Sequence, residues 1–165
     1  MGRIDKENYY LDIAQTVAER STCARKRYGA LIVRNDEIVS TGYNGAPRGR
    51  ANCIDLGYCI RNKLNLPSGE RYELCRSVHA EMNAIISASR QECIGGTLYL
   101  AGFEATTGDY VKNIRPCSMC SRVIINAGIK KIVMRTSADT YETMNVQEMV
   151  FNDDTIIDPS KYDFE

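Results

Sequence analysis

Two short motifs constrain the fold of this chain more than any other feature of its sequence. The only histidine lies in His79–Glu81 (HAE), and a pair of cysteines lies in Pro116–Cys120 (PCSMC). The surrounding residues predict that each motif stands in the first turn of a helix, where the partial positive charge favours thiolate over thiol. One imidazole and two thiolates form a ligand set that zinc accepts in catalytic sites, with a fourth position left for water. The fold must therefore bring two helix starts that are distant in the chain to one metal ion.

Glu81 supplies the group that a hydrolytic zinc site needs beside its ligands. It stands two residues after His79, so its side chain points away from the face of the helix that carries the ligand. A carboxylate in that position can take a proton from zinc-bound water and pass it to a leaving amine. A lone histidine is usually a core or surface residue, and a lone C-x-x-C is usually a structural zinc or redox motif. Together, the two motifs predict a catalytic zinc site in which Glu81 is the acid–base and the ligands are His79, Cys117 and Cys120.

Composition bounds the class of protein and its partners. The chain has 165 residues, of which 44% are apolar and 25% are charged, as in a soluble domain with its own core. Basic and acidic residues number 21 each, and a net charge of zero argues against binding to long nucleic acid. No apolar run is long enough to span a membrane, and the opening MGRIDKENYY lacks the core of a signal peptide. We therefore expect a cytoplasmic protein whose seven cysteines are reduced.

The order of the predicted elements favours an α/β fold in a single domain, residues 1–165. In chain order the elements are a helix over 6–20, strands at 31–33 and 38–41, a long ordered loop with a short helix over 54–76, a helix over 77–90, a strand over 95–102, a helix over 116–127, a strand over 129–135 and a short helix within 144–154. Asp5 and Ser77 are the expected N-caps of the first two long helices. This alternation predicts a mixed sheet with helices packed on it.

Three stretches resemble one branch of a known enzyme superfamily. They are TGYNGAPRG (41–49), ELCRSVHAEMNAI (73–85) and INAGIKKIV (125–133), and with the two motifs they resemble the deoxycytidylate deaminases of the cytidine deaminase superfamily. The resemblance runs from about Tyr9 to about Arg135. It implies a three-layer α/β/α sandwich with a five-stranded mixed sheet. It also implies zinc-dependent hydrolysis of dCMP to dUMP and ammonia, which would supply dUMP for thymidylate synthesis.

The implied reaction assigns roles to residues around the zinc. Glu81 would protonate N3 of the pyrimidine and then the departing nitrogen, and the backbone beside Ala80 would bond O2 of the base. The resemblance implies that Asn44 contacts the sugar and that a tyrosine after the last motif strand faces the substrate. Tyr141 is the nearest residue for that second role, although its register is late.

The phosphate of a nucleotide substrate requires cations in its binding site. The resemblance also implies nucleotide effectors and an oligomeric assembly. Two groups of basic residues flank the predicted hairpin, and they are Arg25, Lys26, Arg27, Arg48 and Arg50. Regulated relatives bind dCTP as activator and dTTP as inhibitor, with magnesium, near a Gly-Tyr-Asn-Gly stretch that corresponds here to Gly42, Tyr43, Asn44 and Gly45. Such relatives are homo-oligomers, commonly hexamers, which is the assembly expected here.

Four further cysteines predict a second, structural zinc. They are Cys23, Cys53, Cys59 and Cys75, and they bracket the weakly patterned loop that precedes His79. The resemblance implies ligands at the positions of Cys23 and Cys53, and the other two are added because they flank the same loop. The alternative is four small buried hydrophobic residues, the role that we expect for Cys93.

Two other functions remain open from sequence. The first is another deaminase of the superfamily, acting on tRNA adenosine, free cytidine or cytosine, but the zero net charge weakens a tRNA partner. The second is a non-enzymatic accessory protein of DNA uptake that retains the fold. Glu81 argues against the second function, because a structural zinc has no use for an adjacent carboxylate.

Overall fold

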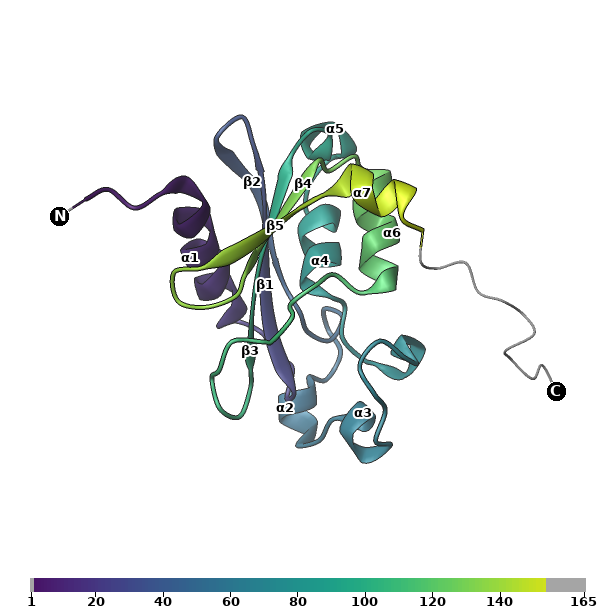
Figure 1. Cartoon of the computed structure of the whole chain (residues 1–165). Coiled ribbons are helices and arrows are strands. Elements are labelled where there is room, and N and C mark those ends of the chain that lie inside the picture. Colours follow the sequence, from purple (N-terminus) through teal and green to yellow (C-terminus); the bar gives the residue numbers. More distant parts are fainter. Residues whose placement is uncertain (1, 154–165) are drawn as a thin grey trace.

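A five-stranded mixed sheet lies between two layers of helices in the computed structural model, which describes residues 2–153 (Figure 1). The strand order is β2-β1-β3-β4-β5, and the strands are β1 (Lys26–Arg34), β2 (Glu37–Tyr43), β3 (Thr97–Glu104), β4 (Lys131–Arg135) and β5 (Tyr141–Asn145). β3 and β4 are parallel, and the other neighbouring pairs are antiparallel. The predicted three-layer α/β/α sandwich is confirmed.

One face of the sheet is covered by α1 (Lys6–Ala18). Asp5 caps this helix as predicted, since its side chain accepts a hydrogen bond of 3.0 Å from the backbone N–H of Asn8. Leu11 and Ala14 are fully buried against the sheet. A Cβ added to Gly29 of β1 would lie 2.0 Å from the carbonyl oxygen of Ala14, so only glycine permits this close contact between helix and strand.

The opposite face carries the helices that begin at the two motifs. α4 (Ala80–Ile86) and α6 (Ser118–Ala127) lie side by side, and the short helices α5 (Arg90–Cys93) and α7 (Val146–Phe151) extend this layer (Figure 1). Their apolar side chains form the larger core with β1, β3 and β4. A Cβ on Gly42 of β2 would lie 2.3 Å from the backbone nitrogen of Ala84, so the absence of a side chain at Gly42 sets how closely α4 approaches the sheet.

The loop between β2 and α4 is ordered by short helical turns. It contains α2 (Cys53–Leu56), α3 (Ile60–Lys63) and the 3-10 turn η1 (Tyr72–Leu74), where the sequence predicts one short helix. η1 reaches the start of α4, because the rings of Tyr72 and His79 lie 5.1 Å apart. The predicted loop therefore forms part of the surroundings of His79.

Two elements differ from the sequence prediction. β5 has no predicted counterpart, because most of its residues are exposed and give no apolar alternation; its pairing with β4 creates the strand. α4 begins at Ala80 with His79 as its N-cap, so Ser77 is not the cap, and the Ser77 hydroxyl is buried without a hydrogen-bond partner. Residues 154–165 of the predicted single domain lie outside the described residues, and none of the described helices is long and apolar enough to cross a membrane.

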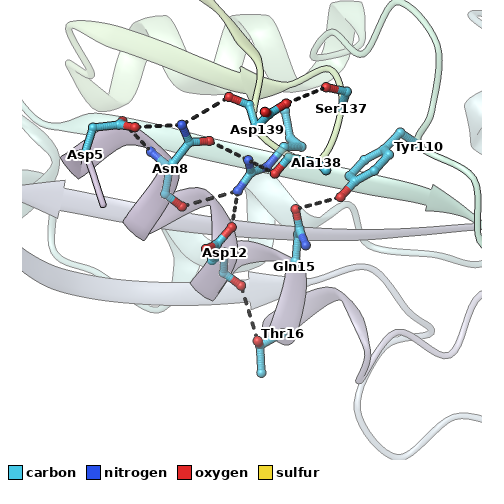
Figure 2. Close-up of polar contacts among 10 residues, drawn as sticks. Asp5, Asn8, Asp12, Gln15, Thr16, Tyr110, Ser137, Ala138 and Asp139 are labelled. Carbon is cyan, nitrogen blue, oxygen red and sulfur yellow. Dashed lines mark hydrogen bonds and ion pairs between the residues drawn. The ribbon is translucent and has the colours of Figure 1, made fainter. Parts of the chain in front are cut away.

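A buried arginine joins β4 to α1 and to the turn before β5. Arg135 is 0% exposed, and its guanidinium donates to Asn8 Oδ1 at 2.6 Å and to the carbonyl oxygen of Ala138 at 2.8 Å. It also forms an ion pair with Asp12, so α1 and the 136–140 turn are held by one side chain. Figure 2 shows three of the residues that it joins, Asn8, Asp12 and Ala138.

Arg135→Met is expected to lower the free energy of unfolding by about 2–3 kcal/mol, because it removes several hydrogen bonds of a buried group at once. Asp12 is half exposed and can turn to water, so it adds little to this loss. Arg122→Met is the matched control, since Arg122 is exposed. Urea unfolding of both variants measures the difference, and equal stabilities would contradict the structural role of Arg135.

Candidate catalytic metal centre

Three ligand atoms from two helix starts meet at one point. His79 Nδ1 lies 3.4 Å from Cys117 Sγ and 3.4 Å from Cys120 Sγ. His79 is the N-cap of α4 and Cys117 is the N-cap of α6, so each residue lies just before its helix rather than within the first turn. Within residues 2–153, no other set of three or more histidine, cysteine or acidic side chains brings its ligand atoms within 4.8 Å of one another.

The spacing of these atoms fits zinc. Zn–S bonds of about 2.3 Å and Zn–N bonds of about 2.0–2.1 Å at tetrahedral angles separate sulfur and nitrogen by about 3.6 Å. The observed separations are 3.4 Å for both cysteines, and all three ligand atoms lie within 4.8 Å of one another. A donor set of two sulfurs and one imidazole is also the chemistry that zinc prefers.

The three ligands strongly change one another's proton affinity when no metal ion neutralises them. A hydrogen bond from Cys120 lowers the pKa of Cys117 to about 4, although burial opposes this. The same interaction, together with burial, raises the pKa of Cys120. Burial lowers the pKa of His79, but hydrogen bonds to Cys117 and Cys75 outweigh burial and raise this pKa to about 10. At neutral pH the metal-free set therefore holds one thiolate, one thiol and one imidazolium.

Zinc uptake at pH 7 is expected to release two protons, one from His79 and one from Cys120. Because their pKa values are raised and that of Cys117 is lowered, two protons compete with zinc between about pH 5 and pH 9. The apparent affinity should therefore rise about 100-fold per pH unit in this range. Competition against a chelator at several pH values measures the slope, and a tenfold rise per unit or less would contradict this charge assignment.

Glu81 is buried beside the ligands without being one of them. It is the second residue of α4 and is 6% exposed, and its pKa is raised because burial disfavours the charged carboxylate. The neighbouring charge on His79 opposes this shift. A carboxyl group with a raised pKa can both accept and donate a proton near neutral pH, which is the requirement for a general acid–base.

His79, Cys117 and Glu81 form part of the wall of one cavity, and Cys120 lies buried behind them. The polar and aromatic walls of the cavity include Tyr28, Asn44, Tyr72 and Ser77. Four cationic residues also line it, and they are Arg25, Lys26, Arg61 and Arg115. Glu81 is the one acidic side chain among the described residues that line the cavity, so the site favours an anionic ligand.

The side-chain amide of Asn44 is largely engaged with the protein. Its Oδ1 accepts from Ser21 Oγ at 2.6 Å and from the backbone N–H of Tyr28 at 2.7 Å, and its Nδ2 donates to the carbonyl oxygen of Lys26 at 2.9 Å. An amide nitrogen carries two hydrogens, so one N–H remains for a sugar hydroxyl. Asn44 lines the cavity, and its sugar contact stays a prediction.

Two predicted substrate contacts do not line this cavity. Successive side chains of a strand point to opposite faces, so Lys26 lines the cavity whereas Arg27 lines a hollow beside α1 with Gln15 and Phe103. Tyr141 is the first residue of β5, is 38% exposed and pairs with Arg135. Within the described residues, neither Arg27 nor Tyr141 can therefore contact a ligand in this cavity.

The Gly42–Gly45 stretch has a structural explanation. Gly42 permits the close approach of α4, and a Cβ on Gly45 would lie 2.4 Å from Thr22 Oγ1. Gly45 also forms a two-way bridge with Val78, which precedes His79, through hydrogen bonds of 3.2 and 2.8 Å. This stretch thus fixes the position of the HAE motif, and an effector role for Tyr43, whose side chain is exposed, stays a prediction.

The four cysteines predicted to hold a structural zinc do not form a compact ligand group, and the second zinc stays a prediction. No three sulfurs of Cys23, Cys53, Cys59 and Cys75 lie within 4.8 Å of one another, although all four residues are described. Cys23 and Cys75 line the catalytic cavity, and Cys53 is buried at the start of α2. Cys93 is buried in the core as expected, and all seven cysteines are unpaired.

Sequence analysis missed several residues of the cavity wall. Arg61 and Tyr72 lie in the weakly patterned loop, where no periodicity indicates which side chains point inward. Ser77 precedes a helix and so resembles an N-cap in the sequence, but it lines the cavity. Arg115 carried the one available signal, since it immediately precedes the Pro116–Cys120 motif.

Comparison with known proteins agrees with this site. The family description "Cytidine and deoxycytidylate deaminase zinc-binding region" matches residues 4–136. Deoxycytidylate deaminase of Mycobacterium phage D29 is 36% identical over 137 residues, which cover 81% of this chain and 96% of that protein. ComE operon protein 2 of Bacillus subtilis is 31% identical over 153 residues, which cover 92% of this chain and 68% of that protein.

A solved structure provides the same comparison in three dimensions. The dCMP deaminase of cyanophage S-TIM5, crystallised in complex with dCMP and dUMP, is 25% identical with a TM-score of 0.54. The match covers 82% of this chain and 85% of that one. With the ligand geometry described above, these similarities show that the chain belongs to the cytidine and deoxycytidylate deaminase family, whose zinc-binding region it carries.

Proposed function

We propose that this protein is a zinc-dependent deoxycytidylate deaminase that converts dCMP to dUMP and ammonia. The observation that carries the proposal is the convergence of the three ligands beside buried Glu81, in a cavity lined by four cations. The similarity to a phage deoxycytidylate deaminase and to a deaminase crystallised with dCMP supports the choice of substrate. The product dUMP would supply thymidylate synthesis.

Different residues of the site would hold the metal, transfer protons and bind the base. His79, Cys117 and Cys120 would hold zinc, which when bound supplies a Lewis acid that activates water near neutral pH. Glu81 takes a proton from the attacking water on its carboxylate and delivers it to N3 of the base. It then takes the second proton from the hydroxyl added at C4 and delivers it to the departing amine, which leaves as ammonia. The N–H of Ala80, in the first turn of α4, has no acceptor within the helix and would bond O2 of the base.

The phosphate is assigned to the cation with the weakest existing interactions. Arg115 pairs with Glu142, and Lys26 pairs with Glu104 at 3.5 Å. Arg25 lines the cavity, and within residues 2–153 the one hydrogen bond of its guanidinium goes to the hydroxyl of Ser68, at 3.5 Å. Its guanidinium is therefore the group that can turn to a 5′-phosphate at the smallest cost.

Initial rates on a panel of substrates test the proposal. dCMP, dCTP, deoxycytidine, cytidine and adenosine are compared by ultraviolet absorbance, and dCMP is expected to give the highest kcat/KM. Arg25→Gln should raise KM for dCMP about tenfold, whereas Arg27→Gln, on the opposite face of the sheet, should leave it unchanged. Deamination of the non-phosphorylated substrates alone would overturn the assignment.

Regulation and assembly remain proposals from the resemblance. We expect a cytoplasmic homo-oligomer, a hexamer, whose rate responds to dCTP and dTTP with magnesium. Light scattering and initial rates with each nucleotide measure both properties. The similarity to ComE operon protein 2 alone does not favour a non-enzymatic role, because a buried carboxyl group beside a metal site is costly without a catalytic use.

A further inference from the structure

We propose that Arg61 is a positioning residue of the catalytic site. It fixes residues 67–71 as a cover at the cavity mouth and, through Tyr72, holds the ring of His79 in the orientation that presents Nδ1 to the two sulfurs. The inference rests on the proposed function in one respect: the cavity beside His79 is taken as the place of catalysis. Its experiment includes readouts that need no substrate.

Arg61 is a buried cation that organises a segment without regular structure. Arg61 is 3% exposed, and it lies in α3, on the wall of the catalytic cavity. One terminal nitrogen, Nη1, donates to the carbonyl oxygens of Glu70 at 2.6 Å and Arg71 at 3.1 Å. The other, Nη2, donates to the carbonyl oxygen of Pro67 at 2.6 Å. One guanidinium therefore ties together both ends of the stretch 67–71.

These acceptors explain why the residue is an arginine. The planar guanidinium has five N–H donors in a fixed fork and can serve several carbonyls at once, whereas a lysine ammonium is a compact point charge. Among residues 2–153, no carboxylate lies within 4.0 Å of the Arg61 nitrogens, so its acceptors there are neutral. A buried charge whose hydrogen-bond acceptors are all neutral is costly, and Glu73, whose pKa it helps to lower, is exposed, so the position of Arg61 points to a role at the cavity.

Tyr72 connects Arg61 to the metal centre. The guanidinium carbon of Arg61 lies 4.6 Å from the centre of the Tyr72 ring, a cation–π contact. On its other side, the Tyr72 ring stands edge-on to the His79 ring, with centroids 5.1 Å apart and planes at 87°. The Tyr72 hydroxyl also accepts a hydrogen bond of 3.1 Å from the N–H of Gly69, which belongs to the segment that Arg61 holds.

These contacts restrict the orientation of the His79 ring. Its Nδ1 faces both sulfurs at 3.4 Å, and the Tyr72 ring packs against it from the loop side. Groups that orient a metal-binding histidine typically contribute 10- to 100-fold to metal affinity. The same segment places Ser68 at the cavity wall, 3.5 Å from the Arg25 guanidinium, so its position also affects substrate binding.

Hydrogen exchange and kinetics of Arg61 variants test the first part of the inference. In the zinc-loaded full-length chain, Arg61→Met is expected to speed amide exchange over 64–74 about tenfold or more while β1 and β3 exchange as before. KM for dCMP should rise about tenfold with a smaller change in kcat, because the cavity mouth rather than the reacting groups is disturbed. Lys63→Met is the matched control, since Lys63 lies in the same helix and contacts Tyr58 outside the cavity.

Arg61→Lys keeps the result interpretable if Arg61→Met fails to fold. A lysine retains the charge but cannot serve the carbonyls of Pro67, Glu70 and Arg71 together, so exchange over 64–74 should still be faster than in the wild type. Wild-type exchange over 64–74 in either folded variant would overturn the inference. Faster exchange throughout the sheet, with kcat lowered and KM unchanged, would also overturn it, because that pattern indicates general destabilisation.

Zinc release from Tyr72 variants tests the second part. Tyr72→Leu should release zinc to a chelator about 10- to 100-fold faster than the wild type, whereas Tyr72→Phe, which keeps the ring, should remain close to it. Equal release by Tyr72→Leu and the wild type would overturn the contact with His79 as a positioning device. Exchange and zinc release require no dCMP, so both results can stand even if the substrate panel rejects dCMP.

Discussion

Glu81→Gln is expected to lower kcat about 1,000-fold or more while the chain retains its zinc, because glutamine cannot accept or deliver the protons of the reaction. The amide has nearly the shape of the carboxyl group, and Glu81 is not one of the three ligands, so the metal site should persist. Burial raises the pKa of Glu81, so the substitution removes a carboxyl group that holds its proton more tightly than an exposed glutamate.

The measurement combines steady-state rates with elemental analysis of the same preparation. Glu37→Gln serves as the control, because Glu37 is an exposed carboxylate at the start of β2, and it should keep full activity. A Glu81→Gln enzyme that deaminates at the wild-type rate would remove the acid–base assignment. Loss of zinc together with activity would show instead that Glu81 supports the metal site.

Cys120→Ser is expected to abolish both zinc binding and turnover. Cys120 is fully buried, and its sulfur is one of two anionic ligands. A serine hydroxyl does not ionise near neutral pH and is a harder, shorter ligand, so two of the three donors would remain and the zinc affinity should fall by orders of magnitude. The expected loss of kcat/KM is about 1,000-fold or more.

Cys59→Ser is the matched control for this substitution. Cys59 lies outside the metal centre and is the N-cap of α3, so this variant should keep one zinc per chain and its activity. Elemental analysis of both variants distinguishes the two cysteines. A Cys120→Ser chain that keeps stoichiometric zinc would contradict the ligand set, and a Cys59→Ser chain that loses the catalytic zinc would contradict the place of Cys59 outside the metal centre.

The chemistry of the site could be predicted from the sequence because its ligands lie in two contiguous motifs. Spacing within a motif fixes which side chains share a helix end, so His79, Glu81, Cys117 and Cys120 could be assigned before any distance was known. The sheet followed from apolar strands at its centre, whereas β5 escaped because an exposed edge strand is defined by its partner β4 rather than by its own pattern.

The cavity wall could not be predicted in the same way. Arg27 and Lys26 are adjacent and equally basic, and only the register of β1 decides which of them reaches the cavity. The cysteines around the long loop predict a second metal site, but the sequence does not fix how closely their sulfurs approach one another, and within the described residues they form no compact ligand group. Arg61 and Tyr72 act through contacts with carbonyls and rings that no local pattern encodes.

The reactive groups lie on two neighbouring helices, whereas the groups that would select the substrate lie elsewhere in the chain. α4 carries Glu81 and follows His79, α6 contains or follows both sulfurs, and the same sheet supports both helices. The groups that would meet the rest of a substrate come from outside these helices, and they are Arg25, Lys26, Ser68 and Arg115. Substitutions in the connecting segments can therefore alter substrate preference over evolutionary time while the hydrolytic machinery stays intact.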